Sequence, residues 1–197
     1  MEVCVYLVRH GETDYNLRGQ LQGSTIDAPL NGTGRAQAQT LRDASALPEG
    51  TDEKNIWIRH KNYVLNYFST VIDAKLYSSP MIRALETGEI ATGRSKADFI
   101  LDSRIRERSF GKWDGKYRED LDARCRELGA KDIFGLKEEG METDGETQAR
   151  VKAFFDDLVK DLRPDDKNIC IFAHGGLIRQ FLMHLKSRNA VIPDQVF

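Results

Sequence analysis

The sequence predicts a three-layer α/β fold, in which a mainly parallel central sheet is flanked by helices on both faces. Two short apolar runs, 3–8 and 169–173, have the β-rich, non-alternating composition of strands buried on both faces. Segments of helical periodicity separate these runs and the other expected strands, and such alternation favours parallel pairing. A chain of 197 residues suits one domain of this kind, so we expect a single domain over 1–197.

Each of the two apolar runs leads into a histidine. The first ends at Arg9 and His10, and the second is followed by His174 and Gly175. The carboxyl ends of parallel strands form the edge at which open α/β sheets bind ligands. The chain has only 4 histidines, so two in this position indicate a site, although a buried structural role would suit either one alone.

Periodicity and turn signals predict the elements between these two runs. A helix is expected over about 33–46 and a strand over 74–78. Ser79 before Pro80 predicts a helix start, with the hydroxyl as cap and proline in the first turn. The remaining elements are a strand over 99–101, a turn over 111–115 and a charged surface helix over about 117–129.

The clearest helical pattern follows Thr143. This residue and Glu146 fit a capping box. The residues after it form a single apolar stripe at helical spacing: Val151, Phe154, Phe155, Leu158, Val159 and Leu162. A last helix is expected after His174, with apolar residues such as Leu177 and Phe181 buried.

Residues 48–70 predict an inserted helical segment. Its aromatic-rich stripe, which includes Tyr63, Tyr67 and Phe68, must be covered either by the parent domain or by a second chain. We expect it to pack within its own chain and leave a monomer, and a dimer through the insertion is the alternative.

Composition narrows the function classes. The net charge is −2 with no basic block, which argues against nucleic-acid or anionic-membrane binding. No apolar stretch approaches the roughly 20 residues of a membrane helix, and the first residues lack the pattern of a secretory signal. The 3 cysteines have no C-x-x-C spacing, so neither a disulfide nor a zinc site is expected. A cytoplasmic location is the expectation.

Two arginines join the histidines in the predicted site. Arg9 ends the first strand, and Arg83 lies one turn into the helix expected after Ser79. If the strand ends are neighbours, these guanidiniums and the imidazoles of His10 and His174 converge on one pocket. Guanidinium forks and helix N-termini suit a phosphoryl group, so the pocket predicts a phosphate dianion as ligand.

A neutral imidazole in such a pocket can attack phosphorus and form a phosphohistidine. The leaving alkoxide then needs a proton from a carboxylic acid, for which Glu12, Glu86 and Glu107 are candidates. We expect Glu12 to be a structural ligand of backbone or arginine. Glu107 follows a strand and could reach the pocket, whereas the alternative makes it a solvated partner of Arg106 or Arg108.

At these residues the chain resembles the histidine phosphatase superfamily, also called phosphoglycerate mutase-like. The resemblance covers nearly the whole chain in order. Its motifs are Arg9-His10-Gly11-Glu12-Thr13 with Asn16, residues 30–34, Ser78-Ser79-Pro80 with Arg83, Ala84 and Thr87, Glu107 with Phe110-Gly111 and Asp114-Gly115, Gly145-Glu146-Thr147, and His174-Gly175.

The resemblance implies a role for each matching residue. His10 would be the phosphorylated nucleophile and Glu107 the proton donor. The residues implied to hold the phosphoryl group or substrate are Arg9, Asn16, Gln22, Gly23, Arg83, Glu107, His174 and Gly175. The resemblance implies that no metal is needed, and we expect no cofactor.

Within the superfamily, 22–30 and 102–108 are most similar to TIGAR-type fructose-2,6-bisphosphatases. The long segment that mutases carry between acid and second histidine is missing, which favours a phosphatase. The expected substrate is a small phosphorylated metabolite, with a sugar bisphosphate such as fructose 2,6-bisphosphate as one possibility. A phosphoglycerate mutase and a catalytically silent phosphate-binding scaffold are the alternatives. Relatives usually continue past the position that corresponds to Phe197 into another strand. The sequence leaves open whether the native chain continues beyond Phe197.

Overall fold

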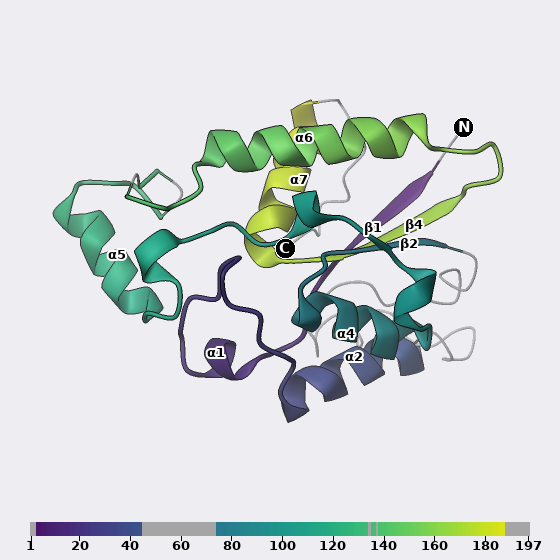
Figure 1. The fold of residues 1–197 in the computed structure, drawn as a ribbon, viewed down its shortest axis with the longest axis horizontal. Helices are drawn as coiled ribbons and strands as arrows, with labels where there is room; N and C mark the ends of the chain where they lie inside the picture. The colour runs from purple at the N-terminus through teal and green to yellow at the C-terminus, as the bar shows by residue number, and fades with distance from the viewer. Residues whose placement is uncertain (1–2, 45–73, 134, 137, 188–197) are drawn as a thin grey trace.

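A computed structural model describes residues 3–44, 74–133, 135–136 and 138–187. Its sheet is parallel throughout, with the described strands in the order β1-β4-β2-β3. The strands are β1 (Cys4–Arg9), β2 (Lys75–Ser78), β3 (Ile100–Leu101) and β4 (Asn168–Ala173). Helices cover both faces of this sheet, which confirms the predicted α/β class (Figure 1).

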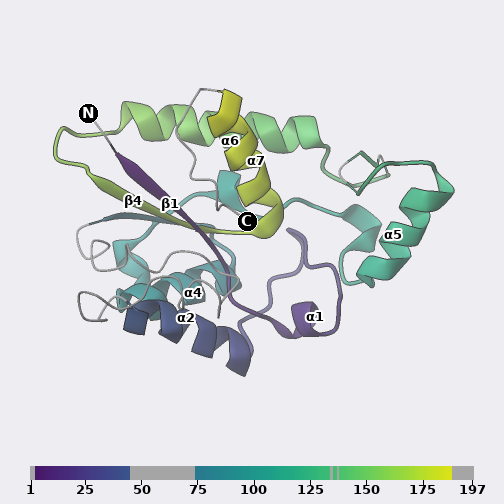
Figure 2. The same cartoon turned by 180° about the vertical axis from the view of Figure 1, so that it is seen from behind.

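The helices divide between the two faces of the sheet. Helices α2 (Gly32–Ala44) and α4 (Ile82–Thr92) lie on one face, and α6 (Asp144–Lys160) and α7 (Gly175–Ser187) lie on the other (Figures 1 and 2). Short α1 (Asp14–Leu17) and α5 (Arg118–Glu127) lie beyond the ends of the strands. Within the described residues, the connections contain three short 3₁₀ helices, η2 (Lys96–Asp98), η3 (Ser103–Ile105) and η4 (Gly111–Trp113).

Strand β4 lies inside the sheet and contributes to two apolar clusters, one on each face. Residues 169–173 are fully buried, and their side chains alternate between two apolar clusters. Phe172 packs with the α2 and α4 side, whereas Ile171 packs with Phe154 and Phe181 from α6 and α7. The run 3–8 is mostly half-buried, because β1 lies at the edge of the described sheet. The prediction of complete burial was therefore right for β4 and only partly right for β1.

Most predicted elements are present. The helix expected over 33–46 is α2, and the charged helix expected over 117–129 is α5. The capping box of α6 is confirmed, since Thr143 Oγ1 accepts from the Glu146 N–H at 3.2 Å and Glu146 Oε2 accepts from the Thr143 N–H at 2.8 Å. The stripe of α6 is buried at Val151 and Leu158 but becomes exposed at Val159.

The predicted start of α4 was wrong by two residues. The helix begins at Ile82 with Met81 as N-cap. The Met81 side chain makes no capping bond, and Asp27 Oδ1 from the loop before α2 instead accepts from the Ile82 N–H at 2.7 Å. Ser79 is still in line with the strand, because its N–H donates to Phe172 O at 2.9 Å. Its hydroxyl accepts only weakly from the Met81 N–H, at 3.3 Å, and makes a second bond described below.

Some predictions concern residues that are not described. The helical segment expected over 48–70, its aromatic stripe and the monomer-or-dimer question that depends on it lie outside the described residues. Among the helices that the structure describes, none combines the length and the apolar character that crossing a bilayer requires.

Candidate active site

His10 and His174 lie side by side at the carboxyl edge of the sheet. Strands β1 and β4 pair with Arg9 opposite Ala173, and the His10 N–H continues the ladder by donating to Ala173 O at 3.0 Å. This register places the two imidazoles together, with 5.2 Å between ring centroids and 58° between ring planes. The expected convergence of the two strand ends is therefore present in the structure.

The buried ring of His10 has a defined proton position. Its Nδ1 lies 2.7 Å from Gly11 O, and a carbonyl oxygen can only accept, so Nδ1 carries the proton. Burial and the Arg83 and Arg9 guanidiniums lower the pKa of His10 to about 3. The ring is consequently neutral at neutral pH, and its lone pair is on Nε2.

His174 is fully buried beside it. Its Nε2 lies 2.8 Å from the Ser79 hydroxyl, across the β4–β2 pair. Burial, Arg83 and His10 keep the pKa of His174 well below its usual value. Both imidazoles are therefore uncharged, and the positive charge at this edge belongs to the arginines.

Arg83 is a fully buried cation next to the two rings. The backbone carbonyls of Ile26 and Gln22 accept from its Nη1 and Nη2 groups at 2.8 and 3.1 Å. Burial lowers the pKa of Arg83 to about 10, opposed by Glu107, so it stays charged at neutral pH. Burying a cation is costly, and a bound dianion would offset that cost.

Thr87 connects the loop after β1 to helix α4 through two hydrogen bonds. Its hydroxyl accepts from the Gly11 N–H at 3.0 Å and donates to Arg83 O at 2.6 Å. Gly11 also approaches α2 so closely that a Cβ on it would lie 2.6 Å from Gly34 O. The position of His10 thus depends on a glycine that no larger residue can replace without movement.

Arg9 is exposed and borders the first turn of α7. A Cβ on Gly175 would lie 3.4 Å from Arg9 Nε, so the guanidinium lies close to this glycine. The structure thus brings Arg9, His10, Arg83 and His174 to one edge of the sheet.

Glu107 reaches the same edge from the segment after η3. It is buried, with Oε1 accepting from the Arg108 N–H at 2.9 Å and Oε2 from the Gly176 N–H at 3.1 Å. The alternative that made it a solvated partner of the Arg106 or Arg108 side chain is wrong. Two backbone amides instead fix its carboxylate at the start of α7.

The other two candidates for the proton donor, Glu12 and Glu86, form hydrogen bonds with other parts of the chain. Glu12 Oε1 accepts from the Asn31 side-chain amide at 2.9 Å, so the expectation of a backbone or arginine partner was wrong. Glu86 accepts from the Leu30 N–H at 2.9 Å and from Arg35 Nε at 2.6 Å. Both hold the loop before α2, which leaves Glu107, bound to the Gly176 amide at the start of α7, as the remaining candidate for the proton donor.

Gln22 and Gly23 lie in the loop whose carbonyls accept from Arg83, and Asn16 lies in the preceding short helix α1. Thr13 joins Asn16 and Gln22, since its N–H donates to Asn16 Oδ1 at 3.2 Å and its hydroxyl to Gln22 Oε1 at 2.7 Å. Within the described residues, the buried Nε2 of Gln22 has no hydrogen-bond partner. The Gly23 N–H donates to Asp114 Oδ1 at 3.0 Å, and a Cβ on Gly23 would lie 2.0 Å from that oxygen.

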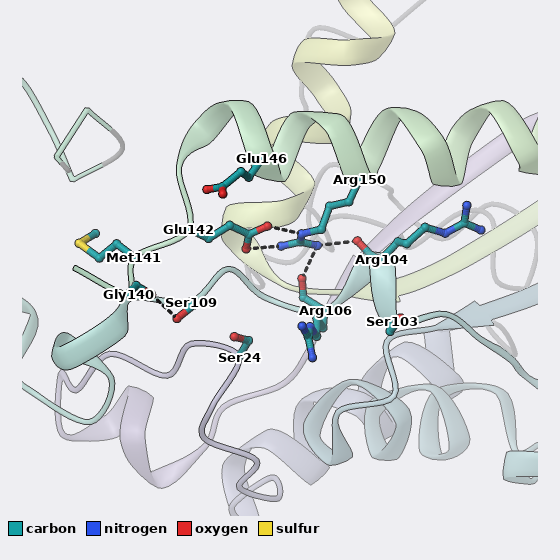
Figure 3. Close-up of a pocket in the computed structure, with 10 residues that line it drawn as sticks. All are labelled: Ser24, Ser103, Arg104, Arg106, Ser109, Gly140, Met141, Glu142, Glu146 and Arg150. Carbon is teal, nitrogen blue, oxygen red and sulfur yellow. Dashed lines mark hydrogen bonds and ion pairs between the residues drawn. The ribbon is translucent and has the colours of Figure 1, made fainter. Parts of the chain in front are cut away.

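A pocket of about 540 Å³ opens beside the segment that leads into Glu107 (Figure 3). Arg150 of α6 crosses it, binding both carboxylate oxygens of Glu142 and donating to Arg106 O at 2.8 Å. Arg150 therefore ties the backbone before Glu107 to α6. The residues lining the pocket are Ser24, Ser103, Arg104, Arg106, Ser109, Gly140, Met141, Glu142, Glu146 and Arg150.

Sequence reasoning missed two contacts of this site. Ser79 was interpreted as a helix cap, and the amide of Gly176 was not considered as a partner for Glu107. A glycine directly after His174-Gly175 was the available signal for a close approach in that turn.

The chain is similar to proteins of known family and structure. The family model described as histidine phosphatase superfamily (branch 1) matches residues 5–52 and 62–193. The zebrafish (Danio rerio) fructose-2,6-bisphosphatase TIGAR B is 33% identical over 119 residues, which are 58% of this chain but only 37% of that protein. The solved phosphoglycerate mutase of Thermus thermophilus is 32% identical, with a TM-score of 0.63 over 96% of this chain and 88% of that one. A mycobacterial glucosyl-3-phosphoglycerate phosphatase solved with VO3 is 25% identical, with a TM-score of 0.68 over 91% and 79%.

Proposed function

The chain belongs to the histidine phosphatase superfamily, and we propose that it hydrolyses phosphate monoesters through a phosphohistidine formed on His10. The observation that carries the proposal is the proton position on His10. Its Nδ1–H donates to Gly11 O at 2.7 Å, so the lone pair on Nε2 is available to a substrate. The low pKa of about 3 keeps this nucleophile unprotonated across the physiological range.

In the first step, His10 Nε2 attacks phosphorus while the bond to the leaving oxygen breaks. The protonated carboxyl of Glu107 gives its proton to that oxygen, so an alcohol leaves and the phosphoryl group stays on His10. In the second step, water attacks the phosphoryl group, the N–P bond breaks and the Glu107 carboxylate takes a proton from the water. Inorganic phosphate leaves, and both residues return to their starting state.

The remaining charged groups would bind the phosphoryl oxygens. Arg83 suits the binding of phosphoryl oxygens, because the carbonyls of Ile26 and Gln22 accept from its guanidinium and hold it in position before a ligand binds. Such preorganised charge does not have to reorient as charge develops in the transition state, and it usually supplies the largest share of catalysis. Arg9 and His174 would also bind these oxygens. Further contacts would come from the side-chain amide of Asn16 and from Nε2 of Gln22, which has no hydrogen-bond partner in the part of the chain that the structure describes.

The proposed substrate is a small phosphorylated metabolite, and a sugar bisphosphate is the first class to test. The similarity to a zebrafish protein named as a fructose-2,6-bisphosphatase supports this choice over 58% of the chain. The similarity to a solved phosphoglycerate mutase supports a second candidate, in which the phosphoryl group returns to a product instead of passing to water. The monomeric state and the cytoplasmic location remain predictions.

A product assay separates these candidates. The full chain and its His10→Ala variant would be incubated with fructose 2,6-bisphosphate, with phosphoglycerates and with nucleotides. Hydrolysis predicts free phosphate from the parent protein and none from the variant. Conversion of 3-phosphoglycerate to 2-phosphoglycerate without free phosphate would favour the mutase, and inactivity on every compound would favour the phosphate-binding scaffold.

A further inference from the structure

Ser79 makes a contact that the proposed chemistry does not use. Its side chain is fully buried between β2 and α4, and its hydroxyl lies 2.8 Å from Nε2 of His174. The opposite ring nitrogen, Nδ1 of His174, is also buried, and it has no hydrogen-bond partner among the described residues. The ring is therefore held at one nitrogen and unsatisfied at the other.

The hydrogen bonds of the Ser79 hydroxyl define which group donates. A hydroxyl has one proton to give and two lone pairs to accept with. Ser79 Oγ already accepts from the Met81 N–H at 3.3 Å. Nε2 of His174 is the acceptor within reach of its proton in the described part of the chain, so donation from Ser79 leaves no buried hydroxyl proton unpaired.

We propose that Ser79 is a positioning residue, which donates to Nε2 of His174 and thereby fixes the neutral ring with its proton on Nδ1. The Nδ1–H is then a buried donor without a protein partner among the described residues, 5.2 Å ring-to-ring from His10. A phosphoryl oxygen is the acceptor that satisfies it. The opposite tautomer would present a lone pair to the same oxygen and repel it.

The two histidines thus reach the same tautomer through different partners. His10 donates from Nδ1 to the Gly11 carbonyl, which exposes a lone pair on Nε2. His174 accepts at Nε2 from Ser79, which exposes a proton on Nδ1. One ring becomes the nucleophile and the other the donor that holds the phosphoryl group. This inference rests on the proposed function and adds a role for Ser79. Its main test measures the tautomer of His174 and does not depend on catalysis.

The test is a long-range ¹H–¹⁵N correlation spectrum of the full chain, which shows directly which ring nitrogen carries the proton. Single His→Gln variants at positions 10, 60 and 184 assign His174 by elimination. At neutral pH the parent protein should show His174 protonated on Nδ1. Ser79→Ala should shift the ring toward the Nε2-protonated form, whereas Ser79→Thr, which keeps the hydroxyl, should preserve the parental pattern.

Ser78→Ala is the matched control. Ser78 is adjacent and equally buried, but its hydroxyl donates to Ser79 O and not to His174. It should leave the His174 tautomer unchanged. In the same samples, Ser79→Ala should weaken binding of inorganic phosphate by about tenfold, since a directed donor to a charged ligand is lost.

A His174 ring protonated on Nε2, or on both nitrogens, in the ligand-free parent protein would overturn the inference even if the variants fail to fold. An unchanged tautomer in folded Ser79→Ala would also overturn it, and unchanged phosphate affinity would contradict the role of Nδ1. A protein that shows the predicted tautomer but no phosphatase activity would reject the proposed function alone.

Discussion

The backbone N–H of Gly176 donates to Oε2 of Glu107 at 3.1 Å, and this bond joins the segment after η3 to the first turn of α7. The approach is close enough to exclude a side chain, because a Cβ on Gly176 would lie 2.6 Å from Oε1 of the same carboxylate. The residue directly after the His174-Gly175 pair thus fixes the position of the proposed proton donor.

Gly176→Ala should therefore displace Glu107 and impair proton donation. We expect kcat on an alkyl phosphate to fall by about tenfold or more, with a smaller loss on p-nitrophenyl phosphate, whose leaving group needs little protonation. Steady-state kinetics on both substrates measure this difference. Gly145→Ala is the control, since Gly145 is likewise the second residue of a helix but has open space around its Cβ position.

Glu107→Gln tests the acid directly. Glutamine keeps the size of the side chain but cannot release a proton, so the alkyl phosphate should be slowed by about 10²-fold or more. The aryl phosphate should be affected less. Equal losses on both substrates would mean that Glu107 serves binding or folding.

Stability should depend on pH through His10. Its pKa is about 3 in the folded protein against 6.5 for the free side chain, so the unfolded chain binds more protons between these values. Folding stability should consequently fall as pH drops from 6.5 toward 3, by up to about 1.4 kcal/mol per pH unit from this residue.

Urea unfolding of the parent and of His10→Gln at several pH values measures that contribution. The parent should lose stability more steeply on acidification than the variant, because glutamine does not titrate. Parallel stability curves for the two proteins would show that His10 is not shifted in the folded state.

Arg83→Lys should reduce phosphate binding although it keeps the charge. Lysine cannot donate to the Ile26 and Gln22 carbonyls and to a ligand with the same planar fork. We expect inhibition by inorganic phosphate to weaken by about 10- to 100-fold. Arg35→Lys, at a half-exposed ion pair with Glu86, is the control and should bind phosphate like the parent.

The helices and strands were predictable from the sequence, because the spacing of apolar residues and the local composition depend only on neighbouring positions. The stripe of α6 and the box formed by Thr143 and Glu146 follow from residues only a few positions apart. The sequence also predicted that His10 and His174 lie at the same edge of the sheet, because the carboxyl ends of parallel strands form one edge. Their meeting was predicted only on the condition that the two strands are neighbours, and the β1–β4 pairing fulfils that condition.

Contacts between side chains of different segments were not predictable in this way. The Ser79 hydroxyl bonds a residue 95 positions away, and Gly176 bonds one 69 positions away. Glu12 bonds Asn31, where backbone or arginine was expected. Each of these partners depends on how loops pack after the strands have paired, which spacing along the chain does not encode.

Trapping the phosphoenzyme tests the central claim most directly. The parent protein and the variants His10→Ala and His184→Ala would be mixed with p-nitrophenyl phosphate, quenched in alkali and analysed by peptide mass spectrometry. We predict one base-stable, acid-labile phosphoryl group on the peptide containing His10 in the parent and in His184→Ala, and neither label nor hydrolysis in His10→Ala. Hydrolysis by His10→Ala at the parental rate would contradict the account.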